Sequence, residues 1–168
     1  MKKKTITGYV RHPRYGNDSI HKGNSFSKDD IKSSYWYYKF VKFFPKSAIV
    51  ADISKQDYTT FPRRLYVDIE QQCVECNRAF IFYALEQQYW YEKLKFYIDA
   101  DCKKCIECRN KEKKLKQSKA KYDKLITTKN RTITEIKELK SIALELSEMG
   151  LLRNRNKLAQ ILNMKEVE

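Results

Sequence analysis

Two Cys-x-x-Cys pairs constrain this chain more than any other feature of its sequence. Cys73 and Cys76 form the first pair, and Cys105 and Cys108 form the second. Two thiolates three positions apart can bind one metal ion from a single tight turn. Two such turns complete the tetrahedral four-sulfur shell that structural Zn2+ prefers, with no position left open for a substrate. The spacing therefore predicts one structural zinc ion bound by these four cysteines.

The sequence leaves alternatives open at this site. Cys102 lies three positions before Cys105, so it could replace Cys105 or Cys108 as a ligand. We favour Cys108, because a cysteine at the start of a helix gains from the helix N–H groups, which stabilise its thiolate. A Cys-x-x-Cys pair can also be a redox dithiol, but two pairs within about 35 residues favour a metal. His12 and His21 lie far from both pairs in the sequence and are not expected to be ligands.

Composition indicates a small folded protein of the cytoplasm. Of its 168 residues, 42% are hydrophobic, which is enough for a packed core. The basic start is not followed by the apolar run of a secretory signal, and no run of about 18 apolar residues occurs. Five cysteines, four of them paired in this way, fit reduced thiolates better than a disulfide framework.

The positive charge is concentrated in one stretch of the chain. The formal net charge is +14, and residues 102–131 hold 12 Lys and Arg against 3 acidic residues. A focused positive field attracts polyanions, so we expect nucleic-acid contacts there and at a basic pair further upstream. The candidate contacts are Arg63, Arg64, Arg109, Lys111, Lys113, Lys114, Lys116, Lys119 and Lys121. The alternative is an ordinary lysine-rich helix exposed to water.

The central segment, residues 65–113, is expected to be the zinc finger. Leu65–Glu70 and Phe80–Tyr83 have the composition of strands, which places the first cysteine pair at the tip of a hairpin. Ala84–Leu94 favours a helix. On that helix we expect Leu85, Tyr89 and Trp90 to be buried, and Glu92 and Lys93 to face water.

Residues 1–64 are expected to be a basic, aromatic-rich arm that packs on the finger. Ser27 and Asp30 predict the start of a helix. The aromatic run Ser33–Pro45 could end that helix or form a strand, and its side chains could be core or a platform for nucleic-acid bases. Residues 46–64 read as an extended connector.

Residues 114–168 are expected to be a helical tail. A charged helix from Arg109 to Lys124 leads into it, and Thr132–Glu135 is a capping box that opens a second helix. Gly150 suits the end of that helix, and Asn154 can cap a last short one. Apolar residues recur at helical spacing from Ile133 to Met149, and this stripe could pack within the tail or bind a partner protein.

A set of motifs runs through residues 8–113 and includes both cysteine pairs. The others are His12–Gly16, Ala51–Gln56, Pro62–Arg64, Tyr66–Glu70, Phe80–Phe82, Glu86–Gln87, Trp90–Tyr91 and Asp99–Cys102. Together they resemble a family of bacterial zinc-finger domains of the zinc-ribbon or treble-clef type. The resemblance implies an α+β finger whose zinc ligands are Cys73, Cys76, Cys105 and Cys108, with no established activity.

Three classes of function compete. The basic run favours binding of nucleic acid or a ribonucleoprotein, and the apolar stripe favours a protein-interaction adaptor. An enzyme has little support, because the chain has only two His and lacks a Gly-rich phosphate loop and a nucleophile elbow. We expect a non-catalytic zinc protein that binds nucleic acid, with the adaptor as the alternative.

Overall fold

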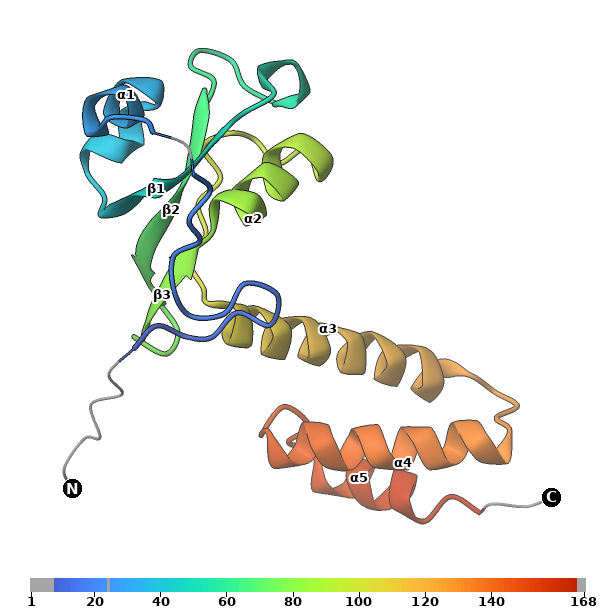
Figure 1. The fold of residues 1–168 in the computed structure, drawn as a ribbon. Coiled ribbons are helices and arrows are strands. Elements are labelled where there is room, and N and C mark those ends of the chain that lie inside the picture. The colour runs from blue at the N-terminus through green and yellow to red at the C-terminus, as the bar shows by residue number, and fades with distance from the viewer. Residues whose placement is uncertain (1–7, 24, 166–168) are drawn as a thin grey trace. The chain divides into compact units, whose positions relative to one another are not determined.

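The computed structural model describes residues 8–23 and 25–165. The chain divides into two compact units, Met1–Arg109 and Asn110–Glu168 (Figure 1). The predicted arm and most of the predicted finger therefore belong to one unit. Helix α3, Ile106–Thr127, contributes residues to both units.

A three-stranded antiparallel sheet organises the first unit. Its strands are β1 (Phe43–Val50), β2 (Leu65–Gln72) and β3 (Ala79–Phe82), in the order β1-β2-β3. The central strand β2 is buried along most of its length, and α1 and α2 lie on opposite sides of the sheet (Figure 1). The predicted hairpin of β2 and β3 is confirmed.

The prediction of a connector over residues 46–64 is wrong at its start, because residues 46–50 belong to strand β1. Pro45 lies inside β1, which is an edge strand, where a missing N–H costs no central ladder bond. The register is also irregular between Phe44 and Ile49, which lets β1 follow β2 on both sides of the proline.

The helices of the first unit are short. They are α1 (Lys28–Ser34), α2 (Ala84–Gln88), a π-helical turn over Tyr89–Lys93, and 3-10 turns over Trp36–Lys39 and Ile53–Lys55. The capping box of Ser27 and Asp30 is present as predicted. The 3-10 turn divides the aromatic run. Tyr35 and Tyr38 enter the core, while Trp36 and Phe40 stay exposed.

The prediction for α2 and its π-helical turn is wrong for Tyr89 and Glu92, whereas Lys93 faces water as expected and the partly buried Trp90 packs against the core. The buried residues include Gln87, Tyr91 and Glu92, whereas Tyr89 is half exposed. Polar side chains occupy the inner face because they bind backbone groups there. Gln87 Nε2 donates to the carbonyls of Val67 and Phe82, and Glu92 Oε1 accepts from the N–H of Asp52. Bonded in this way, a buried polar group loses little by leaving water.

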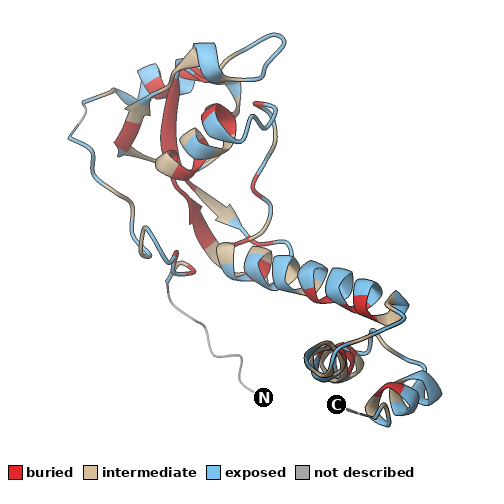
Figure 2. Cartoon of the chain, turned by 90° about the vertical axis from the view of Figure 1, so that its right-hand side faces the viewer, coloured by how far each residue is buried: buried red, intermediate tan, exposed pale blue. Residues whose placement is uncertain are grey.

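The second unit packs the C-terminal part of α3 with α4 (Ile133–Glu148) and α5 (Arg155–Leu162). Buried residues lie on the inner sides of these helices (Figure 2). They are Tyr122, Leu125, Leu139, Ile142, Ala143, Leu146 and Ile161. The predicted caps Thr132 and Asn154 are formed, and Gly150 has the left-handed backbone expected at a helix end, with φ 71°. The centre of the apolar stripe is therefore covered inside the unit.

Helices long and apolar enough to cross a membrane are absent from the part of the chain that the structure describes.

Candidate metal centre

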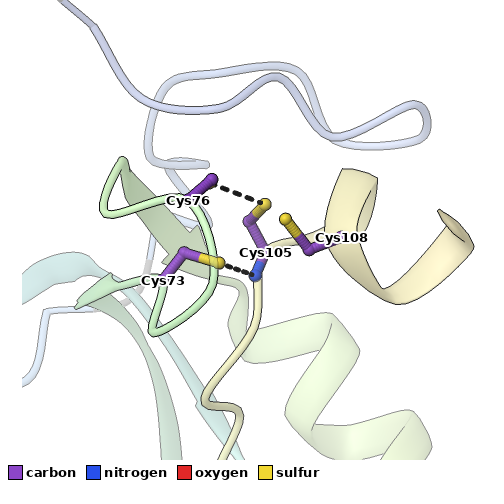
Figure 3. Close-up of side chains that lie close together, drawn as sticks. All are labelled: Cys73, Cys76, Cys105 and Cys108. Carbon is purple, nitrogen blue, oxygen red and sulfur yellow. Dashed lines mark hydrogen bonds between the residues drawn. The ribbon is translucent and has the colours of Figure 1, made fainter. Parts of the chain in front are cut away.

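The structure brings the four predicted ligands together. Cys73 and Cys76 lie in the turn between β2 and β3, Cys105 directly precedes α3, and Cys108 lies in its first turn (Figure 3). All four sulfur atoms lie within 4.8 Å of one another, and those of Cys76 and Cys105 are 3.8 Å apart. A tetrahedral shell with Zn–S bonds of about 2.3 Å requires sulfur separations of about 3.8 Å. The four cysteines therefore fit one structural zinc ion.

Backbone hydrogen bonds shape the first turn. The N–H of Asn77 donates to the carbonyl of Cys73 at 2.9 Å, and the N–H of Cys73 donates to the carbonyl of Arg78 at 3.0 Å. Asn77 has φ 57°, a left-handed conformation that asparagine adopts more readily than most residues. The N–H of Val74 also donates to the carbonyl of Lys103, which ties this turn to the segment before the second pair.

Hydrogen bonds favour the thiolate form of the first cysteine pair. Burial opposes ionisation of Cys73, but N–H groups of Cys105, Cys76 and Glu75 outweigh it and lower its pKa to about 6. The Cys105 N–H lies 3.3 Å from the Cys73 sulfur (Figure 3). Burial also opposes ionisation of Cys76, yet hydrogen bonding from Arg78 lowers its pKa. Arg78 is a supporting residue that the sequence analysis missed; its position two residues after Cys76 was the available signal.

The second pair of sulfurs, those of Cys105 and Cys108, needs a bound cation to become anionic. Burial, followed by bonds to the neighbouring thiols, raises the pKa of Cys108 to about 12, and burial also raises the pKa of Cys105. Four thiolates cannot lie this close together without a cation among them. A bound Zn2+ supplies that positive charge.

Cys102 is excluded from the cluster, which settles the alternative at the second pair. Its sulfur is buried and lies 3.5 Å from the carbonyl of Lys104, and burial raises its pKa to about 12. His12 and His21 are also outside the group of four, as expected.

A partly buried ion pair supports the start of α3. Arg109 Nη2 lies 2.7 Å from Glu86 Oε1, and the Arg109 guanidinium lies 5.2 Å from the centre of the Trp90 ring. His12 Nε2 is 3.8 Å from the same carboxylate oxygen. Arg109 is thus engaged inside the unit rather than being a free surface cation. The resemblance motifs that contain Glu86 and Trp90 meet here, beside the residue that follows the second cysteine pair.

The other predicted nucleic-acid contacts differ in their exposure to solvent. Arg63 is only 3% exposed and contacts the rings of Tyr35 and Tyr91, so its predicted contact with nucleic acid is wrong. Arg64 is exposed, and so are the six candidate lysines of α3. Three of these lysines face acidic partners, in the pairs Lys114–Glu145, Lys116–Glu112 and Lys121–Glu138.

A closed four-cysteine shell, with one pair in a hairpin turn and the other at a helix start, defines a structural zinc finger of the treble-clef type. The comparison with known families agrees: residues 67–117 match the family described as "Probable treble clef domain". The predicted α+β class and zinc-finger type are confirmed. No curated protein and no solved structure matches the chain.

Proposed function

We propose that this protein is a non-catalytic nucleic-acid-binding protein in which zinc only organises the fold. A four-thiolate shell has no free coordination position for a substrate. The proposal includes a cytoplasmic location, because thiolate ligands persist in a reducing compartment.

The observation that supports nucleic-acid binding is the set of unpaired lysines on α3. Lys111, Lys113 and Lys119 are exposed, and within residues 8–23 and 25–165 none of them forms an ion pair. Lysines that form no ion pair keep their full charge available for phosphate. Contacts of this kind supply affinity with little reading of sequence.

The adaptor alternative loses its main support. It relied on the stripe from Ile133 to Met149 being available to a partner. The centre of that stripe, including Leu139 and Leu146, packs against α3 residues and Ile161 within the second unit. We therefore place nucleic acid ahead of a protein partner.

Salt dependence tests the proposal. The zinc-loaded protein is titrated with fluorescent 20-nucleotide RNA and DNA at several salt concentrations, and anisotropy gives the dissociation constant. We expect log affinity to fall linearly with log salt. A triple variant, Lys111→Gln, Lys113→Gln and Lys119→Gln, should reduce the slope by about two for a single strand.

The matched control removes the same charge elsewhere, at the exposed residues Lys46, Lys93 and Lys165. It should keep most of the slope. Absent binding, or a salt-independent affinity, would refute the proposed function.

A further inference from the structure

A second basic surface lies in the first unit, away from the metal. A hollow of about 530 Å3 opens beside α1, the 3-10 turn Trp36–Lys39 and the segment before β2. Its size falls within the range of about 300–1,000 Å3 that is common for ligand sites. Its lining includes Lys32, Tyr35, Trp36, Lys39, Phe61 and Arg64.

Two of these side chains are large aromatic rings exposed to water. Trp36 is 50% exposed and Phe61 is 66% exposed. Trp36 has a firm support, because the buried ring of Tyr35 lies 5.7 Å from it, centre to centre. The hydroxyl of Tyr35 is in turn bonded to the carboxylate of Asp99. The Trp36 ring is thus held in a fixed place, while Phe61 lies on the segment before β2.

The charged groups of the hollow are all positive. Lys32, Lys39 and Arg64 line it, and no acidic residue does. Among the residues that the structure describes, these three cations form no ion pair. Arg64 Nη2 donates to the carbonyl of Ser33 at 2.9 Å, which fixes the guanidinium and leaves other N–H groups for a phosphate oxygen.

Exposed aromatic side chains with cationic side chains beside them are suited to a ligand that has flat π-faces and a negatively charged backbone. Single-stranded nucleic acid has both: unpaired bases stack on aromatic side chains while Lys and Arg bind the phosphates. Bases in a duplex are already stacked on one another, so a duplex offers only its phosphates. We propose that this hollow binds unpaired nucleotides of single-stranded RNA or DNA, with Trp36 and Phe61 stacking on bases and Lys32, Lys39 and Arg64 contacting phosphates. The assignment builds on the proposed function and adds a site and a strand preference to it.

The test uses the zinc-loaded full chain and the variants Trp36→Ala and Phe61→Ala. Each should weaken binding of an oligo-U or oligo-dT 12-mer by about tenfold, within the stacking energy of about 1–3 kcal/mol per base. Binding of a 12-base-pair duplex should not change. The salt slope should also persist, because no charge is removed. Tyr89→Ala is the matched control, since Tyr89 is also 50% exposed but lines another part of the unit, and it should bind like the wild type.

Tryptophan fluorescence gives a direct readout. The chain has two tryptophans, Trp36 and Trp90. We expect the oligonucleotide to quench the wild type, and the quenching to disappear in Trp36→Ala, which keeps Trp90. Zinc content and circular dichroism establish that each variant is folded.

The outcomes separate the two proposals. If the wild-type protein binds no nucleic acid, both the proposed function and this site are refuted. If the wild-type protein binds and the affinities of Trp36→Ala and Phe61→Ala are unchanged, only the site is refuted. Equal competition by poly-glutamate would also overturn it, because an acidic peptide has charge but no bases.

Discussion

The guanidinium carbon of Arg63 lies 4.5 Å from the centre of the Tyr91 ring. The centre of the Tyr35 ring is 4.2 Å from the same carbon. This cation is buried with aromatic faces as its main electrostatic partners, and Arg63 Nη1 adds a bond of 3.3 Å to Gln87 Oε1. Cation–π attraction is strongest where water is excluded. Arg63 thus has a structural role, whereas its neighbour Arg64 faces solvent.

This contrast predicts opposite effects at adjacent residues. Arg63→Ala should lower the free energy of unfolding by about 3 kcal/mol, because it leaves a cavity and removes the cation–π contacts. Arg64→Ala should change stability by less than about 0.5 kcal/mol and weaken oligonucleotide binding instead. Urea unfolding and anisotropy measure the two effects. The assignment of roles is wrong if Arg63→Ala is as stable as Arg64→Ala.

Metal content should distinguish ligand from non-ligand cysteines. Cys108→Ser should reduce zinc to well below one ion per chain and unfold the region around the metal, because binding energy is part of the folding energy. Cys102→Ala should keep one zinc per chain, since its sulfur lies outside the cluster. Elemental analysis after gel filtration gives the ratio. A zinc-free Cys102→Ala protein would contradict the ligand set.

Removing the buried partner of the Glu86–Arg109 pair should be costly. Burial raises the pKa of Glu86, while Arg109 acts in the opposite direction and favours the carboxylate. Glu86→Gln should lower the free energy of unfolding by about 3 kcal/mol, because it leaves the Arg109 charge without its partner. Asp52→Asn is the control: it breaks the exposed Asp52–Lys55 pair, which is worth less than about 1 kcal/mol. Similar losses in the two variants would mean that the Glu86–Arg109 pair has no special role.

The stability of the first unit should depend on the protonation of His12. Burial, followed by the charges of Arg109 and Arg14, lowers the pKa of His12 to about 4. In the unfolded chain the pKa is near 6.5, so the unfolded state takes up the proton first as the pH falls. The contribution of neutral His12 is therefore complete above pH 6.5 and is lost between pH 6.5 and 4.

The matched variant His12→Gln isolates this effect from acid release of zinc, which both proteins share. The wild type's free energy of unfolding, measured relative to the variant, should fall by about 1–2 kcal/mol across that window. Urea unfolding at half-unit pH steps provides the measurement. A constant difference between the two proteins would show that His12 does not titrate in this way.

The helical unit has its own core. Leu139→Ala should destabilise it by about 3 kcal/mol, because Leu139 is fully buried between the helices. Leu144→Ala, on the same helix but exposed, should have an effect within about 0.5 kcal/mol. Thermal unfolding followed by circular dichroism measures both variants. Equal melting temperatures would mean that α4 is not packed as described.

Features determined by local chemistry were predictable from the sequence. The spacing of the cysteines predicted a four-sulfur site with Cys73 and Cys76 as one pair, but Cys102 stayed an alternative at the second pair until the structure placed it outside the cluster. The caps at Ser27, Thr132 and Asn154 were also predictable, since a cap depends on residues within one turn. These patterns need no knowledge of the tertiary structure.

Features determined by tertiary contacts were not predictable. Tyr35 and Trp36 are adjacent aromatics, yet one is core and the other is surface, because the 3-10 turn decides which ring faces the sheet. Arg63 and Arg64 are adjacent basic residues in the sequence, but only Arg63 contacts the rings of Tyr35 and Tyr91. Gln87 is buried in part because the carbonyl of Val67, 20 positions away, accepts from its side-chain amide, and no local pattern reveals that contact.

The location of the sulfur cluster has a further thermodynamic consequence. Cys76 and Cys105 are 29 positions apart, and β3, α2 and the π-helical turn all lie between them. A bound ion therefore acts as a covalent-like cross-link that closes this loop. For a disulfide, closing a loop of comparable length removes unfolded-state entropy worth about 3–4 kcal/mol. Metal loss would return that entropy to the whole segment, including Trp90 and Tyr91, and not only to the two turns that hold the sulfurs.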